Sequence, residues 1–299
     1  MAILLSVFNV SPAKVFAQQM TTAFDPYLFI HQSSDSQLVH KLYTKAHPFL
    51  AEMEAFFGAF SPATITIVLT RSDEEFYQAA RYAIPEWSQA VAFPKERLVI
   101  IKIADADQLL RSPQVLLHEI VHIRAEEYTQ GAYIPGWLNE GLAQYFSGEL
   151  LTLPKKITLS NAINAKKILS LSSLDTMMRF QKPQAELAYI QSVSAIEYIV
   201  EKYNKKSLLV LLNAFRNRYA IDESLKLAFG VDFIDFEINW YEYIYNEYRW
   251  LILLNFNNFL WFLITALIML AILVVRWRNR KKLRHWEEED KRLIYKENR

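Results

Sequence analysis

Residues 117–122 read LHEIVH and residues 137–141 read WLNEG. The first stretch holds the pattern His-Glu-x-x-His, which on a helix places His118 and His122 on one face, where both imidazoles can bind one metal ion. Glu119 is one step further round this helix and can reach a water molecule on that metal. Glu140, in the second stretch, adds a carboxylate. Two histidines, one glutamate and an open fourth position predict a catalytic zinc site.

The residues around the motif predict the elements that carry it. Ser112-Pro113 combines an N-cap serine with a proline at the first helical position, so we predict a helix from Ser112 to about Glu127. A loop over 131–136 then leads into a second helix over 138–147. The two parts of the site therefore lie on consecutive helices.

Two runs rich in β-branched residues, 63–70 and 98–103, predict strands. The second run immediately precedes the motif helix. We expect it to be an edge strand whose residues Val99, Ile100 and Ile101 pair with an extended substrate. The alternative is an ordinary buried strand.

The remaining pattern is mostly helical. Apolar spacing predicts helix over 36–60, broken or kinked at Pro48, and a short capped helix over 72–82. Residues 84–96 are typical of a loop because they contain two prolines. Residues 150–183 indicate short helices and loops. Four further helices are predicted at 185–203, 207–219, 223–229 and 232–248.

Composition excludes several classes of protein. The 299 residues contain no cysteine, so disulfides, zinc thiolates and thiol catalysis are excluded. The net charge of +1 divides into +5 for residues 276–299 and −4 for the rest. This distribution gives no indication of a nucleic-acid-binding domain.

The N-terminal residues predict export. Residues 2–10 are apolar but shorter than the roughly 20 residues that span a bilayer, and small or aliphatic residues follow at 15–17. We interpret residues 1–17 as a signal peptide, with a buried N-terminal strand as the alternative. The catalytic domain then covers 18–249.

The C-terminal residues predict a membrane anchor. An uncharged apolar run from Phe259 to Val275, with its lead-in, is long enough to span a bilayer, which places the transmembrane helix at 250–275. The basic residues of 276–299 make this tail cytoplasmic by the positive-inside rule. A single-pass protein of the cell membrane, with an extracytoplasmic catalytic domain and the lipid bilayer as a partner, is the resulting prediction.

HEIVH, followed downstream by WLNEGLAQYF, resembles the gluzincin metallopeptidases, and most of all the peptidase MA-like family of bacterial membrane or exported proteins. The run WLNEG is also similar to the membrane alanyl aminopeptidases. Residues 188–215 and 228–240 look like the helical tail of the peptidase MA-like domains, so that the likeness covers roughly 38–248. The resemblance implies an α+β, thermolysin-like zincin fold with a small mixed sheet, an active-site helix and a helical C-terminal lobe.

By the same resemblance, His118, His122 and Glu140 match the zinc ligands and Glu119 matches the general base. Tyr189 is where such families often place a tyrosine that hydrogen-bonds the oxyanion, with Tyr145 as a weaker rival.

Two positions beside the ligand glutamate are expected to support the metal ligands, namely Asn139 and Gln144. Related enzymes usually have an acid where this chain has Gln144, so the charge that would orient a histidine is lost at that position. The Gly-x-Met-Glu-Asn signature that anchors a free N-terminus in aminopeptidases is also missing. We therefore predict a zinc-dependent endopeptidase acting on peptides or proteins. The alternative is a catalytically inactive zincin-fold module for binding or assembly at the membrane.

Overall fold

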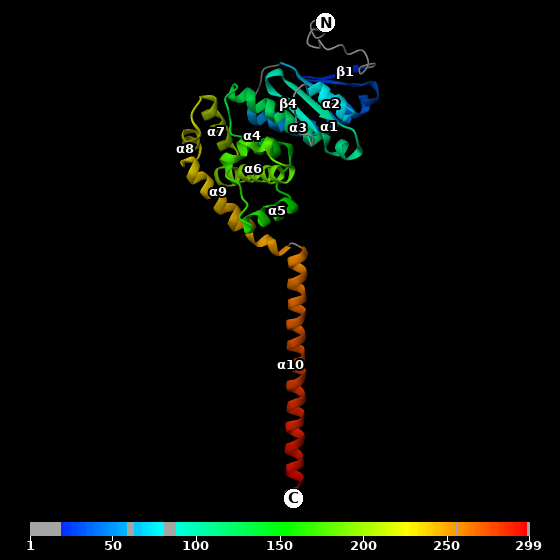
Figure 1. Ribbon diagram of the computed structural model, residues 1–299, viewed down its shortest axis with the longest axis vertical. Helices are drawn as coiled ribbons and strands as arrows, with labels where there is room; N and C mark the ends of the chain where they lie inside the picture. Colours follow the sequence, from blue (N-terminus) through cyan, green and yellow to red (C-terminus); the bar gives the residue numbers. More distant parts are fainter. Residues whose placement is uncertain (1–18, 59–62, 81–87, 255, 298–299) are drawn as a thin grey trace.

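The computed structural model describes residues 19–58, 63–80, 88–254 and 256–297. The predicted signal peptide and its alternative, an N-terminal strand, lie outside these residues. The described chain has an α+β fold, in which a small sheet with its covering helices stands beside a helical lobe, and a long C-terminal helix projects from the end of the lobe (Figure 1).

The sheet is mixed and has the strand order β1-β2-β3-β5-β4. The three central strands β2, β3 and β5 are parallel, whereas β1 and β4 pair antiparallel to their neighbours at the two edges. In β3 the alternating residues Ile65, Ile67 and Leu69 enter the main core, as expected for a strand with period two. The strands are β1 Gln19–Phe24, β2 Tyr27–Gln32, β3 Ile65–Thr70, β4 Ala90–Phe93 and β5 Leu98–Lys102.

The prediction of an edge strand at 98–103 is wrong, because β5 lies between β3 and β4 and its residues Val99, Ile100 and Ile101 are at most 1 % exposed. The edge strand on this side of the sheet is β4, which lies within the stretch 84–96 that was predicted as a loop. Arg97, in the left-handed region at φ 51°, ends the tight connection after Pro94 and lets β4 fold back on β5. Four residues that include two alanines carry too weak a pattern to predict this strand.

Helices cover both faces of the sheet. Helices α1 (Ser36–Phe57) and α3 (Ala106–Thr129) pack together on the main core, and α2 (Asp73–Ala80) covers the other face through Ile100. Helix α1 is continuous through Pro48 rather than divided into two helices.

Helix α3 begins earlier than the Ser112-Pro113 pair predicts. Its N-cap is Asp105, whose side chain accepts a hydrogen bond from the Gln108 N–H at 2.7 Å. Pro113 lies inside the helix and cannot donate to the carbonyl of Leu109. The Ser112 hydroxyl donates to that carbonyl instead, at 2.8 Å, so that the helix continues.

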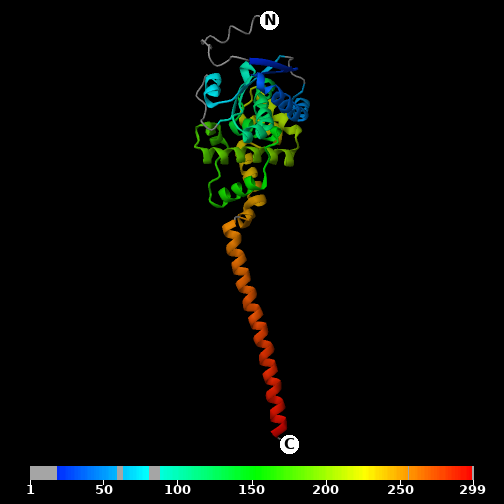
Figure 2. The same ribbon diagram turned by 90° about the vertical axis from the view of Figure 1, so that its right-hand side faces the viewer.

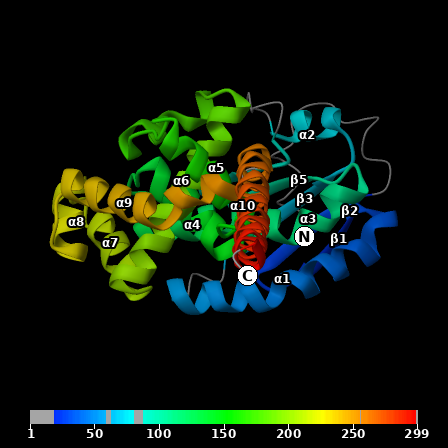
Figure 3. The ribbon, with the colours of Figure 1, turned by 90° about the horizontal axis from the view of Figure 1, so that it is seen from below.

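The helical lobe is built around α4 and α6, which cross closely, and Figure 3 shows it on the opposite side of the long C-terminal helix α10 (Phe256–Glu297) from the sheet. Its core contains two fully buried tryptophans, Trp137 and Trp240, and the Trp240 indole donates to Ser194 Oγ at 3.0 Å. The elements are α4 Gly136–Ser147, α5 Leu153–Asn164, the 3-10 helix η3 Leu171–Arg179, α6 Lys182–Tyr203, α7 Lys206–Arg216, α8 Ile221–Phe229 and α9 Phe233–Tyr248.

Gly141 permits the close approach of α4 and α6. A Cβ at this position would lie 2.5 Å from the Ser192 carbonyl oxygen and 2.6 Å from Ile196 Cγ1. We expect Gly141→Ala to lower the free energy of unfolding by about 1–3 kcal/mol through overpacking, against the gain that alanine gives at an open helical position. Thermal unfolding measures the change, and a melting temperature equal to or above that of the parent would contradict the prediction.

A buried carboxylate pairs with an arginine where the ends of β3 and β5 meet the turn before α1. Burial alone would raise the pKa of Asp35, but its hydrogen bonds with Arg71 lower the pKa below its ordinary value. Arg71 also donates to the Ile103 carbonyl at 2.9 Å. Because the pKa is lower in the folded state than in the unfolded state, the pair stabilises the fold above the unfolded pKa of about 4. This stability is lost as the pH falls through the folded pKa.

For Asp35→Asn we expect a loss of about 1–2 kcal/mol at pH 7, discounted because the Arg71 side chain is 36 % exposed. This corresponds to a fall of about 2–8 °C in melting temperature. The difference between parent and variant should shrink below about pH 4. A difference in melting temperature that stays constant from pH 7 to pH 3 would show that ionised Asp35 does not stabilise the fold through Arg71.

Beyond the lobe, the 3-10 helix η4 (Arg249–Leu254) leads into α10 (Phe256–Glu297). The stretch Phe259–Arg284 is long and apolar enough to cross a membrane, and nothing in the described chain buries it. Figure 2 shows the helix standing clear of the rest of the chain. An apolar helix left uncovered in this way is a candidate membrane span rather than a core helix.

Candidate metal centre

Helices α3 and α4 bring His118, His122 and Glu140 together, and the candidate ligand atoms of the three residues all lie within 4.8 Å of one another. Glu140 Oε2 is 3.4 Å from His118 Nε2 and 3.9 Å from His122 Nε2. The two imidazole rings have centroids 5.0 Å apart. The i, i+4 spacing on α3 therefore produces the cluster that the sequence predicts.

The second nitrogen of each histidine has its own partner. His122 Nδ1 lies 3.1 Å from Asn139 Oδ1, and His118 Nδ1 lies 3.3 Å from Glu149 Oε1. When each Nδ1–H donates to its oxygen, each Nε2 presents a lone pair toward Glu140. Both rings are thus oriented in the way that metal-binding histidines usually are.

The carboxylate beside His118 is Glu149, not a residue at position 144. Gln144 is buried and donates to the Tyr189 carbonyl at 2.8 Å, so its amide links α4 to α6. Glu149 follows Gly148, which ends α4 in the left-handed region at φ 80° and turns the chain back toward the site. The prediction for Gln144 is therefore corrected, and the charge absent at that position comes from Glu149.

Glu149→Gln should weaken metal binding by about 10- to 100-fold, because the variant keeps the shape of the side chain but loses the charge facing His118. The dissociation constant can be measured by competition with a chromophoric chelator. Glu242→Gln, an exposed position on α9, is the matched control and should bind like the parent. Equal affinities in the two variants would show that Glu149 does not support the ligand.

Glu119 is buried against the edge strand. Burial raises the pKa of its carboxyl, and the backbone N–H of Ala92 in β4 donates a hydrogen bond to it. A carboxylate whose pKa is moved toward neutrality is suited to exchange protons near pH 7.

The charges of the cluster favour a cation. Burial would raise the pKa of Glu140, but His122 and His118 hold it below its ordinary value, so Glu140 is ionised. For His118, burial acts to lower the pKa, yet the carboxylates of Glu140 and Glu149 that face its two nitrogens raise the pKa well above its ordinary value. With Glu119, three carboxylates stand beside two imidazoles in a partly buried space, which attracts a metal ion.

Tyr189 of α6 lies at the same site. Burial, followed by the charges of Glu140, Glu119 and Glu149, raises the pKa of its phenol, which is therefore neutral and able to donate a hydrogen bond. Tyr145 is engaged elsewhere, with Lys205 Nζ 5.7 Å from its ring centroid.

A cleft of about 320 Å³ opens beside the cluster. Its walls include His122, Asn139 and Glu140, together with Tyr133 and Asp175 from the loop before α4 and from η3. Tyr133 and Asp175 were not predicted from the sequence, since a polar residue in a loop carries no periodic pattern.

The comparison with known families agrees with this geometry. The family described as the Peptidase MA superfamily matches residues 46–246, a range that contains the whole cluster. No curated protein matches the chain. Because the match covers more than half of the chain, the chain belongs to the Peptidase MA superfamily.

Proposed function

We propose that the chain is a zinc-dependent endopeptidase that hydrolyses peptides or proteins at the outer face of the cell membrane. The observation that carries the proposal is the partly buried cluster of His118, His122 and Glu140 with Glu119 beside it. The arrangement of a small sheet, a motif helix and a helical lobe also resembles a thermolysin-like zincin.

The donor set fits a zinc ion. Glu140 Oε2 is buried, and no described residue donates a well-formed hydrogen bond to it. An orphaned anionic oxygen of this kind is costly unless a cation or donor satisfies it. Two imidazoles and one carboxylate are the ligands that catalytic zinc often has, with one position left open. His118, His122 and Glu140 would hold the ion, which when bound lowers the pKa of a coordinated water to about 7 and polarises a carbonyl.

The residues around the ion supply proton transfer and orientation. Glu119 accepts the proton of the attacking water and returns it to the leaving amine. The neutral Tyr189 phenol donates a hydrogen bond to the oxygen on which negative charge develops. Glu149 and Asn139 hold the two histidines.

The edge strand β4 gives an extended substrate a place to pair, next to Glu119. This role replaces the one expected for Val99, Ile100 and Ile101 of β5. Together with the missing aminopeptidase signature, a substrate held by its backbone favours cleavage within a chain.

The uncovered apolar stretch of α10 supports anchoring in a bilayer. Basic residues follow it directly, including Arg276, Arg278 and Arg280, and the tail 276–299 is proposed to be cytoplasmic. The domain over 18–249 then faces outward, in agreement with a signal peptide at 1–17.

The test uses the full chain in detergent micelles with denatured casein as substrate. We expect one zinc ion per chain and casein fragments with new internal ends. Activity should be lost with 1,10-phenanthroline and restored by zinc. Stoichiometric zinc without hydrolysis of casein would instead support an inactive binding or assembly module.

A further inference from the structure

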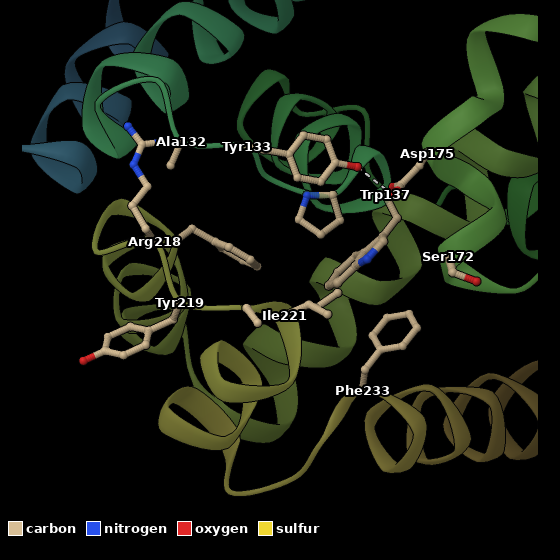
Figure 4. Close-up of a pocket in the computed structure, with 12 residues that line it drawn as sticks. Ala132, Tyr133, Trp137, Ser172, Asp175, Arg218, Tyr219, Ile221 and Phe233 are labelled. Atoms are coloured by element: carbon tan, nitrogen blue, oxygen red, sulfur yellow. Dashed lines mark hydrogen bonds between the residues drawn. The ribbon is translucent and has the colours of Figure 1, made fainter.

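A second and larger cavity, of about 540 Å³, lies next to the metal cleft (Figure 4). It is open to solvent on one side and is lined by the loop before α4, the start of α4, η3, the end of α7 and the first residues of α8 and α9. Its walls are mainly apolar and include Pro135, Trp137, Phe215, Ile221 and Phe233. In Figure 4 the Trp137 and Phe233 rings face this space, whereas the hydroxyl of Tyr219 points away from it.

The cavity adjoins the cleft that holds the metal ligands, because Ala132, Tyr133 and Asp175 line both. Trp137 is three residues before Glu140 on α4, so the two side chains lie on the same face, about 4.5 Å apart along the helix axis. An extended chain advances about 3.3 Å per residue. A polypeptide held at Glu140 therefore reaches the cavity within two to four residues.

The ring of Tyr133 stands at the boundary between the two spaces and is 71 % exposed. Its hydroxyl donates to Asp175 Oδ2 at 2.7 Å, and the other Asp175 oxygen accepts from the Gly136 N–H at 2.7 Å. Both oxygens of this carboxylate are thus occupied. The contact fixes η3 against the start of α4. Of the other polar lining residues, Arg218 donates to the Gln130 carbonyl at 2.9 Å, and the remaining walls are mainly apolar.

Clefts of this size with apolar and aromatic walls bind apolar groups. On the basis of the peptidase function proposed above, we propose that this cavity is a substrate subsite. It accepts an aromatic or branched aliphatic residue two to four positions from the scissile bond, on one side of it. Phe233 supplies one wall, and the fully buried Trp137 packs behind the lining.

Phe233 and its neighbour Ile234 provide a matched pair of variants. Both are in the first turn of α9, where the helix dipole tolerates a carboxylate. Phe233 lines the cavity and is half-buried, whereas Ile234 is 68 % exposed and lies outside the lining. Phe233→Glu therefore places a charge in the subsite, and Ile234→Glu places the same charge on the surface.

The experiment separates binding from hydrolysis. Full-length Glu119→Gln protein in micelles, loaded with zinc, is incubated with a tryptic peptide library from a denatured proteome, and the retained peptides are sequenced by mass spectrometry. We expect enrichment of Phe, Trp, Tyr, Leu and Ile, which Phe233→Glu abolishes and Ile234→Glu preserves. For one retained peptide, replacing its aromatic residue with alanine should weaken binding by about 10- to 100-fold.

The parent is then used to map the cleavage sites in the same library. A preference for aromatic or branched residues at one position two to four residues from the cleaved bond supports the subsite. Absence of retention, unchanged enrichment in Phe233→Glu, or a change in oligomeric state without a change in peptide selection would overturn it. Selective retention by Glu119→Gln without any cleavage by the parent would refute the peptidase proposal and leave the cavity as an apolar peptide-binding site only.

Discussion

Glu119→Gln is expected to lower the kcat of casein hydrolysis by about 10²- to 10⁴-fold while the protein still binds one zinc ion. The variant keeps the size of the side chain and can still contact the Ala92 backbone through its amide. What it loses is the ability to accept a proton from water. A loss of catalysis without a loss of metal is the result that distinguishes a general base from a ligand.

Hydrolysis and zinc content must be measured on the same preparation. Glu242→Gln is the matched control, because it makes the same change at an exposed position on α9, outside the cleft. It should retain most of the activity of the parent. If Glu119→Gln hydrolysed casein at the rate of the parent, the assigned mechanism would be refuted.

Glu140→Gln should lose zinc as well as hydrolysis, whereas Glu119→Gln keeps its zinc. Removing this charge leaves two imidazoles and a neutral amide, so we expect the variant to lose stoichiometric zinc and to lose at least about 10³-fold in hydrolysis. A site without metal also loses the stabilisation that a ligand gives to the folded state, which is about 4 kcal/mol for a ligand at 1,000 times its dissociation constant.

This difference can be measured with a chelator. The melting temperature of the parent should fall in 1,10-phenanthroline to near that of Glu140→Gln, and the variant itself should not respond. If zinc stabilised the two proteins equally, Glu140 could not be a ligand.

The parts of the site that were predictable are those fixed by local geometry. The shared face of His118 and His122 follows from helical spacing alone. The second helix, which carries Glu140, follows from the sequence WLNEG at 137–141. Asn139 also contacts a histidine as expected, because it is next to the ligand on the same helix.

The parts that were not predictable depend on how distant segments meet. The strand β4 is too short to show a period, and only the turn at Arg97 makes it the edge. The start of α3 was misplaced because Ser112-Pro113 has the composition of a helix start. Only the structure shows that Ser112 lies inside the helix, where its hydroxyl donates a hydrogen bond to the Leu109 carbonyl. The identity of the supporting acid, Glu149, depended on the direction of the chain after α4.

The position of Glu149 has a consequence for how such proteins are recognised and compared. An orienting carboxylate need not descend from one fixed column of an alignment, because a left-handed glycine at a helix end can present a later residue to the same imidazole nitrogen. A sequence pattern that requires an acid four residues after Glu140 would discard this chain. A structural criterion that requires a carboxylate oxygen near His118 Nδ1 would retain it.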